Sequence, residues 1–241
     1  MTSPVDPHTK SYSHNNGATS ELLDRLAVSE LCKGWPVYRD ASEWKNFRSL
    51  FAEQADVWTT WSGALPIDDF IEISKRGKEA GAFIMHRECG TLVELNQATD
   101  RAVGKMKATI TQRFTQQPDA TTGSAHEPRG GQLEWDVDCD CVFIFFCLRE
   151  SKDRPWKTRF VKLFYMKDKI VSIDGTHAPE LTAEEVTEME SYPEGYKYLG
   201  LMQKRLGYTI HSTLPTPRNE GWHNMYAAME EWLQGGDVDL F

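Results

Sequence analysis

Hydrophobic and polar positions along the chain predict helices first, then long strands, then helices again. From Ser20 to Leu31 apolar residues recur at spacings of three and four, which is typical of one face of an amphipathic helix. Gly34 and Pro36 then interrupt this pattern. The elements expected in this first part are helix 20–31, helix 42–51, strand 55–61 and helix 68–80.

The middle of the chain predicts a sheet with one solvated face. Between Arg101 and Thr115 small or apolar residues alternate with Lys, Thr and Arg, as in a strand that is buried on one side. Gln116–Gln132 is rich in Gly, Pro and small polar residues, so this loop is either flexible or functional. The expected strands are 83–95, 101–115, 133–149, 156–166 and 169–175, with a tight turn at Lys167-Asp168 between the last two.

The last part of the chain predicts helices. Thr182 followed by Glu185 is a capping-box pattern. The expected helices are 182–190, 194–206 and 220–233, and the aromatic face of the last one is expected to pack on the sheet. The order of elements predicts an α+β fold, in which one curved antiparallel sheet holds helices in its concavity.

Charge and composition argue against nucleic acids and membranes as partners. There are 27 Lys and Arg against 36 Asp and Glu, giving a net charge of −9, and the basic residues form no cluster that would bind a phosphate backbone. The longest apolar run, Val142–Leu148, has the length of a strand and not of a membrane span, and the polar N-terminus lacks the apolar stretch of a signal peptide. We therefore expect a cytoplasmic protein with no nucleic-acid or membrane partner.

Familiar cofactor and metal motifs do not occur in the sequence. It has no glycine-rich phosphate loop, no GxSxG and no HExxH. Cys139 and Cys141 would share one strand face, but the pattern supplies no further metal ligands, so both are expected to be buried thiols. Any chemistry is therefore expected to be done by side chains on a bound organic molecule, without a metal or cofactor.

Two short motifs resemble one enzyme family. Tyr38-Arg39-Asp40-Ala41-Ser42-Glu43-Trp44 places an acidic residue four positions before a Trp, and HRECGT places Thr91 five residues after His86. Both are similar to the opening of SnoaL-like and scytalone dehydratase-like proteins, members of the NTF2-like superfamily of cone-shaped α+β barrels. The resemblance implies an NTF2-like domain over 19–178, preceded by a disordered lead over 1–18 and followed by a helical extension over 179–241 packed on the barrel.

The resemblance also implies roles for individual residues. In dehydratases of this family an Asp and a His form a hydrogen-bonded pair in which the His moves a proton and the Asp orients it, which here assigns His86 and Asp40. At the position of a second catalytic His the strand alternation favours Gln112, although a local Gln-Arg-aromatic triplet would select Thr111. The residues expected to shape the pocket are Tyr38, Trp58, Gln112, Asp140, Phe143 and Phe145.

Structural roles compete with these assignments. Asp40 precedes a predicted helix and could be its N-cap, and His86 could be a partly buried structural residue. Asp136, Asp138 and Asp140 share one strand face, typical of a solvated surface, but apolar residues continue that face after Cys141, which makes Asp140 a candidate for the pocket.

The expected function is a cofactor-independent dehydratase, cyclase or isomerase acting on a hydrophobic oxygenated intermediate, such as a polyketide or meroterpenoid of secondary metabolism. The alternative is a non-catalytic module for small-molecule binding or dimerisation on the same fold. An epoxide hydrolase of the Asp–Arg–Asp type is disfavoured because Arg113 points to the wrong face. The resemblance implies a homodimer.

Overall fold

The structure of the protein is a computed structural model that describes residues 17–116, 133–217 and 219–240. Most of the predicted disordered lead over 1–18, and all but the first residue of the predicted loop over 116–132, lie outside the described residues. The predictions for these two segments are therefore not compared with the structure.

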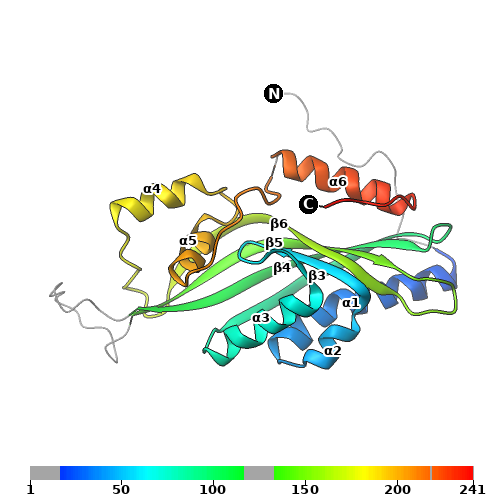
Figure 1. Cartoon of the computed structure of the whole chain (residues 1–241), viewed down its shortest axis with the longest axis horizontal. Helices are drawn as coiled ribbons and strands as arrows, with labels where there is room; N and C mark the ends of the chain where they lie inside the picture. The colour runs from blue at the N-terminus through cyan, green and yellow to red at the C-terminus, as the bar shows by residue number, and fades with distance from the viewer. Residues whose placement is uncertain (1–16, 117–132, 218, 241) are drawn as a thin grey trace.

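A curved sheet with helices on both faces makes up the fold, as predicted (Figure 1). The sheet is open and mixed: the strand order is β2-β1-β6-β5-β4-β3, and β1 pairs with β6 in parallel, where an all-antiparallel sheet was expected. The strands are β1 (Phe51–Thr59), β2 (Gly63–Pro66), β3 (Ile84–Asn96), β4 (Arg101–Gln116), β5 (Leu133–Leu148) and β6 (Lys157–Ser172).

Bulges bend the long strands. The pairing of β3 with β4 shifts between Glu88 and Thr91, and that of β5 with β6 shifts so that Met166 is an extra residue on β6. An extra residue bends a strand without ending it. The tight turn predicted at Lys167-Asp168 is therefore wrong: β6 continues through it, because the backbone keeps its ladder with β5 on both sides of the bulge.

The first helix is longer than predicted. Helix α1 (Thr19–Asp40) continues through Gly34 and Pro36. A proline inside a helix typically costs about 3 kcal/mol. Here the buried stripe that includes Cys32 and Trp35 packs against the sheet on either side of the proline and offsets that cost. Asp40 is consequently the last residue of α1 and not an N-cap of α2 (Trp44–Ser49), whose N-cap residue is Glu43.

Two faces of the sheet carry different layers (Figure 1). The inner face, which includes Gly104 and Gln112 of β4, is covered by α1, α2 and α3 (Ile67–Glu79). Gly104 permits the close approach of α1, because a Cβ atom there would lie 2.3 Å from the Cys32 Sγ. The inner face therefore depends on a missing side chain at the centre of β4.

Helix α6 (Glu220–Leu233) covers part of the outer face. The buried Trp232 indole nitrogen donates to the carbonyl oxygens of Ala102 and Cys147, at 3.1 Å each. Its ring packs edge-on against Phe146 and Phe160, and Trp222 and Tyr226 pack on Phe164. These contacts hold the C-terminal helix on strands β4 to β6.

Helices α4 (Ala183–Ser191) and α5 (Lys197–Arg205) lie at one end of the sheet (Figure 1). The predicted capping box of α4 is confirmed, with reciprocal bonds between Thr182 and Glu185. The Asp168 carboxylate, on β6, accepts a 2.7 Å hydrogen bond from the Leu199 N–H and so ties α5 to the sheet. Burial nevertheless raises the pKa of Asp168 to about 6.

Asp168→Asn is expected to stabilise the protein at pH 8 but not at pH 4. The carboxyl pKa is higher in the folded chain than its ordinary 3.8, so folding favours the protonated form, and stability falls as pH rises from about 4 through 6. The neutral amide removes a penalty of about 3 kcal/mol, which corresponds to a Tm increase of about 6–12 °C at pH 8. Thermal unfolding across this pH range measures it. An equal gain at both pH values, or a gain for Asp153→Asn at an exposed loop, would contradict this account.

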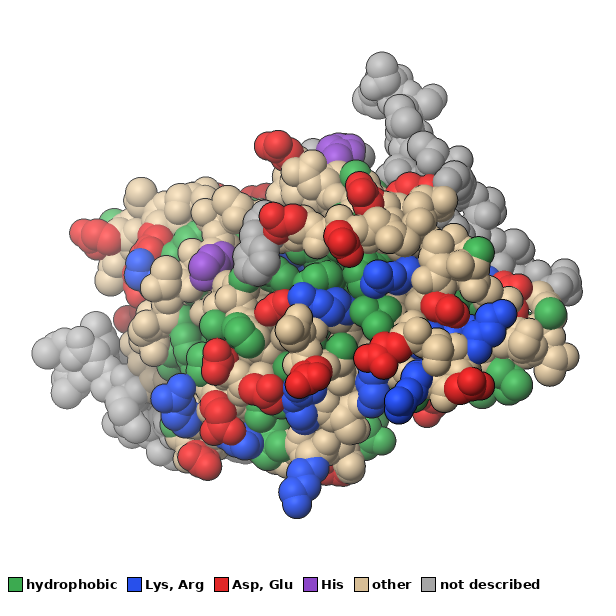
Figure 2. All heavy atoms as spheres, turned by 45° about the vertical axis from the view of Figure 1, so that its right-hand side comes forward, with side chains coloured by type: hydrophobic (Ala, Val, Ile, Leu, Met, Phe, Trp, Pro, Cys, Tyr) green, Lys and Arg blue, Asp and Glu red, His purple; other side chains and the backbone are tan. Residues whose placement is uncertain are grey.

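Charges of both signs are intermixed over the face in Figure 2, with no extended patch of one sign. Such a surface offers no basic track for a phosphate backbone. Within the described residues, no helix combines the length and the apolar character required to cross a bilayer.

Candidate active site

Asp40 and His86 are in direct contact. Asp40 ends α1, and His86 lies on the inner face of β3. The His86 Nδ1 atom is 2.7 Å from the Asp40 Oδ1, and the His86 backbone N–H donates to Oδ2 at 2.6 Å. Both carboxylate oxygens therefore hold the same residue, and they fix the position of its backbone as well as its ring.

This contact sets the proton position on His86. A carboxylate only accepts hydrogen bonds, so Nδ1 carries the ring proton and Nε2 keeps its lone pair. Burial lowers the pKa of His86, and the nearby charges of Arg39 and Lys78 lower it further, against the opposing effect of Asp40. The imidazole is therefore neutral at pH 7, which is the form that accepts a proton.

A small cavity lies beside His86. Its volume is about 30 Å³, enough for one or two water molecules and far below the roughly 300 Å³ of a typical ligand pocket. Aromatic rings occupy most of the surrounding space. The cavity is lined by Trp35, Arg39, Thr59, Thr60, Trp61, Phe70, Ile84, His86, Ile110, Gln112, Phe143, Leu163, Tyr165, Leu199 and Gln203.

Arg39 is the charged group nearest this space. Its side chain is 5% exposed, and among the described residues no atom accepts a hydrogen bond from its Nε or Nη1. The closest carboxylate oxygen, Asp40 Oδ1, is 4.0 Å from Nη1 and already bonded to His86. Burial lowers the pKa of Arg39 to about 10, which leaves the guanidinium charged at neutral pH.

A chain of hydrogen bonds crosses the cavity wall. The Thr60 hydroxyl donates to the Gln203 Oε1 at 2.6 Å, and the Gln203 Nε2 donates to the Gln112 Oε1 at 3.1 Å. The Tyr165 hydroxyl accepts the Thr60 backbone N–H at 3.2 Å. Because Gln203 belongs to α5, the C-terminal extension supplies part of the wall that closes the cavity.

Of the predicted pocket residues, Gln112 and Phe143 line the cavity together with His86. Thr111, the other candidate for the Gln112 position, donates its hydroxyl to Asp138 on the outer face. Phe145 lies on the inner face but one row behind, where its ring packs on Trp35 and Phe143.

Three predicted residues are not brought to the cavity. Tyr38 lies beside Gly34 on the α2 side of α1. Trp58 points to the outer face, where its ring packs on Phe160. For both Tyr38 and Trp58, the sequence pattern predicts that an aromatic side chain is buried, but it does not predict which elements bury it.

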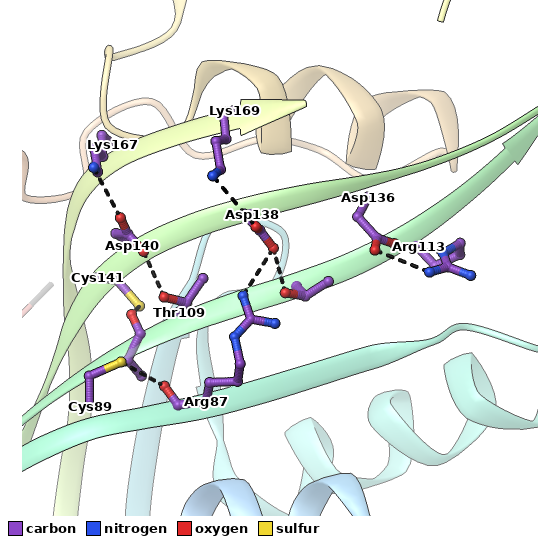
Figure 3. A network of polar contacts seen from close by, with 12 residues as sticks. Arg87, Cys89, Thr109, Arg113, Asp136, Asp138, Asp140, Cys141, Lys167 and Lys169 are labelled. Atoms are coloured by element: carbon purple, nitrogen blue, oxygen red, sulfur yellow. Dashed lines mark hydrogen bonds and ion pairs between the residues drawn. The ribbon is translucent and has the colours of Figure 1, made fainter. Parts of the chain in front are cut away.

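Asp140 is the third predicted pocket residue that does not line the cavity. It was expected to enter the pocket, but in the structure it lies on the outer face. Its carboxylate accepts from the Thr109 hydroxyl at 2.6 Å and pairs with Lys167 on the outer face (Figure 3). Apolar residues do continue the same strand face, but α6 covers them there, so the change from polar to apolar marks the edge of that helix and not a pocket.

Sequence reasoning missed several cavity residues, above all Arg39, Trp35 and Gln203. A signal existed for two of them. Val28, Cys32, Trp35 and Arg39 follow each other at spacings of four, three and four, which places the arginine on the buried stripe of α1. Gln203 gave no such signal, because its place depends on how α5 folds back onto the strands.

Nothing in the described ranges gathers three or more His, Cys, Asp or Glu side chains in a way that could hold a metal ion. Cys139 and Cys141 are both buried on the inner face of β5, where their thiol groups donate to the backbone carbonyls of Gly195 and Ala108. Burial raises the pKa of both thiols, so both are inert, protonated groups at neutral pH.

Comparisons with known proteins agree with this fold. The chain is 37% identical to a PEP2-like protein of Fusarium vanettenii, over 98% of this chain and 97% of that protein. It is 38% identical to pea pathogenicity protein 2 of the same fungus, over 94% and 92%. The crystal structure of a hexachlorocyclohexane dehydrochlorinase, LinA type 2, superposes with a TM-score of 0.50 at 12% identity, covering 67% of this chain and 98% of that one. The family model of the SnoaL-like domain matches residues 20–159, so the chain belongs to the SnoaL-like family, with an NTF2-like fold.

Proposed function

We propose that the protein is a cofactor-independent acid–base enzyme, a dehydratase, cyclase or isomerase acting on a hydrophobic oxygenated intermediate such as a polyketide or meroterpenoid. The observation that carries this proposal is the 2.7 Å contact between Asp40 and His86, which leaves a neutral imidazole with a free Nε2 lone pair beside a cavity. Membership of the SnoaL-like family supports it.

The chemistry needs one base and one group that stabilises negative charge. His86 Nε2 takes a proton from a carbon next to a carbonyl, and the electrons of the C–H bond form an enolate. In a dehydration the enolate then expels a hydroxyl group from the neighbouring carbon, which leaves as water with the proton held by His86. In an isomerisation His86 returns the proton to a different carbon.

Substrate entry requires displacement of side chains that line the cavity. The present cavity holds only one or two water molecules, so a polyketide-sized molecule does not fit without displacing side chains. Leu199 and Gln203 belong to α5 and line the cavity, and Gln203 is held mainly by its bonds to Thr60 and Gln112. Leu199 and Gln203 are therefore among the residues that an entering substrate would displace.

Deuterium exchange in D₂O tests the base without knowledge of the physiological reaction. A panel of hydrophobic β-hydroxy ketones and β-diketones, each with and without a carboxylate, is incubated with the protein, and deuterium incorporation next to the carbonyl is measured by mass spectrometry. We expect acceleration over buffer that falls by about 10²–10⁴-fold in His86→Gln. Because the pKa of His86 lies below its ordinary 6.5 and only the neutral ring is a base, the rate should increase with pH over the acidic range and become constant around neutral pH.

His177→Gln is the matched control. The His177 ring also contacts an aspartate, Asp174, but this pair lies near the surface and outside the cavity. It should leave the exchange rate unchanged. Exchange that is insensitive to His86→Gln, or equally sensitive to both variants, would remove the proposed base.

The second candidate is a non-catalytic binding or dimerisation module. It is favoured by the aromatic rings of Trp35, Trp61, Phe70 and Phe143, which fill most of the space beside His86. This alternative predicts no exchange with any member of the panel while hydrophobic ligands still bind. A homodimer is expected in either case, and light scattering in solution measures it.

A further inference from the structure

The site around Arg39, Lys78 and Asp40 carries more positive than negative charge. The guanidinium and the Lys78 ammonium both lie near Asp40, which is the one carboxylate among the charges that act on His86. Lys78 donates to the Asp40 backbone carbonyl oxygen and not to its carboxylate. Two cations therefore share one anion in this part of the described structure, and the site keeps a net charge of about +1.

The polar atoms left over at the cavity are donors. Arg39 Nε and Nη1 have no acceptor among the described residues, and the same holds for the indole Nε1 of Trp35, whose side chain is 1% exposed. Both residues line the cavity with His86. Buried donors without acceptors destabilise a fold, and in native proteins they call for an explanation such as a bound ligand.

An anionic oxygen group supplies what these donors lack. A guanidinium binds a carboxylate with two parallel hydrogen bonds, which for Arg39 come from Nη2 together with either Nε or Nη1, since Nε and Nη1 lie on different edges of the group. The indole N–H of Trp35 adds a third. The cavity has room for a group of that size, about that of two water molecules, but not for a larger headgroup. A neutral carbonyl alone would leave the excess positive charge in place.

We propose that Arg39 and Trp35 bind the carboxylate of the substrate, so that the protein acts on a carboxylic acid whose acidic carbon lies next to His86. The position of the acidic carbon next to His86 rests on the proposed function. The binding of a carboxylate by Arg39 and Trp35 does not, because binding requires no turnover. Arg39 is then the residue that selects anionic over neutral substrates.

The probe is sodium acetate, followed by sodium hexanoate, titrated against the full-length protein. The His86 ring resonances are followed by NMR at constant ionic strength, with sodium chloride as the reference salt. We expect saturable shifts with acetate and none with chloride, and at least tenfold weaker acetate binding in Arg39→Gln. Arg113→Gln, an outer-face arginine paired with Asp136, should bind as the unaltered protein does.

Titration of His86 gives a readout that a purely structural role of Arg39 would not move. The charged groups facing His86 are Arg39 and Asp40 from α1 and Lys78 from α3. Acetate bound to Arg39 adds a negative charge, so it should raise the pKa of His86 in the unaltered protein and leave it unchanged in Arg39→Gln, where the anion no longer binds. A His86 pKa that acetate does not move in the unaltered protein, or moves equally in Arg39→Gln, would overturn the proposal.

Stability distinguishes a binding arginine from a structural one. The buried Arg39 guanidinium is compensated by a long ion pair with Asp40, at 4.0 Å, and by the face of the Phe70 ring. Because these contacts replace its lost hydration incompletely, Arg39→Met is expected to raise Tm by a few degrees while acetate binding is lost. A lower Tm with unchanged acetate affinity would show that Arg39 is structural. Acetate binding that persists in His86→Gln, together with failed deuterium exchange, would retain the anion site and reject only the catalytic proposal.

Discussion

Asp40→Asn is expected to lower the deuterium-exchange rate by on the order of 10³-fold while the protein stays folded. The His86 backbone N–H can only donate, so it selects the amide oxygen of the new residue as its acceptor. The amide NH₂ then faces the His86 Nδ1 and donates to it. Nδ1 becomes the acceptor, the ring proton moves to Nε2, and the lone pair beside the cavity is lost.

The same substitution on the outer face is the matched control. Asp140→Asn removes a carboxylate that bonds to Thr109 and pairs with Lys167, on the opposite side of the sheet from His86 (Figure 3). It should leave exchange unchanged. NMR of the ring nitrogens reads the tautomer directly, and protonation of Nδ1 in Asp40→Asn would contradict the explanation even if activity fell.

Trp35→Ala is expected to reduce the free energy of unfolding by about 3–5 kcal/mol. The indole is 1% exposed, and its centroid lies 5.2–6.3 Å from those of four phenylalanine rings on α2, α3 and β5 and of Phe51 on β1. Removing it leaves a cavity between α1 and the sheet that the surrounding rings cannot fill. For a chain of this length the loss corresponds to a fall in Tm of about 6–20 °C, measured by calorimetry.

Trp35→Phe separates packing from hydrogen bonding. Phenylalanine retains most of the aromatic contact, and the indole N–H that it removes has no acceptor among the described residues, so the stability loss should be only about 1 kcal/mol. The same variant should weaken acetate binding. If Trp35→Phe were as destabilising as Trp35→Ala, an unrecognised partner of the indole would be the better explanation.

Local sequence signals predicted the elements well where one residue determines the outcome. The alternation in β4 placed Gln112 on the inner face, and the Thr182–Glu185 pair marked the start of α4. They failed where packing overrides local preference. Pro36 reads as a helix end, yet α1 continues to Asp40 because the stripe on either side of it is buried against the sheet.

Long-range contacts explain the remaining differences in the candidate site. The Asp40 and His86 positions came from a resemblance to a family, and no local pattern shows that the end of one helix meets a strand 46 residues later. Asp140 and Trp58 were misplaced because alternation separates the two faces of a strand but does not reveal that a helix covers the outer one. Only the position of α6 on the outer face explains why apolar residues lie on that side of the strands.

The contribution of α5 has a consequence for how specificity could diverge within this family. Residues 20–159 match the family model and contain Asp40 and His86, whereas Leu199 and Gln203 come from beyond that range. Changes in the appended segment would therefore alter the size and lining of the cavity while the Asp40–His86 contact stays untouched. Relatives with different C-terminal extensions would then share one chemistry and differ in the molecules that they accept.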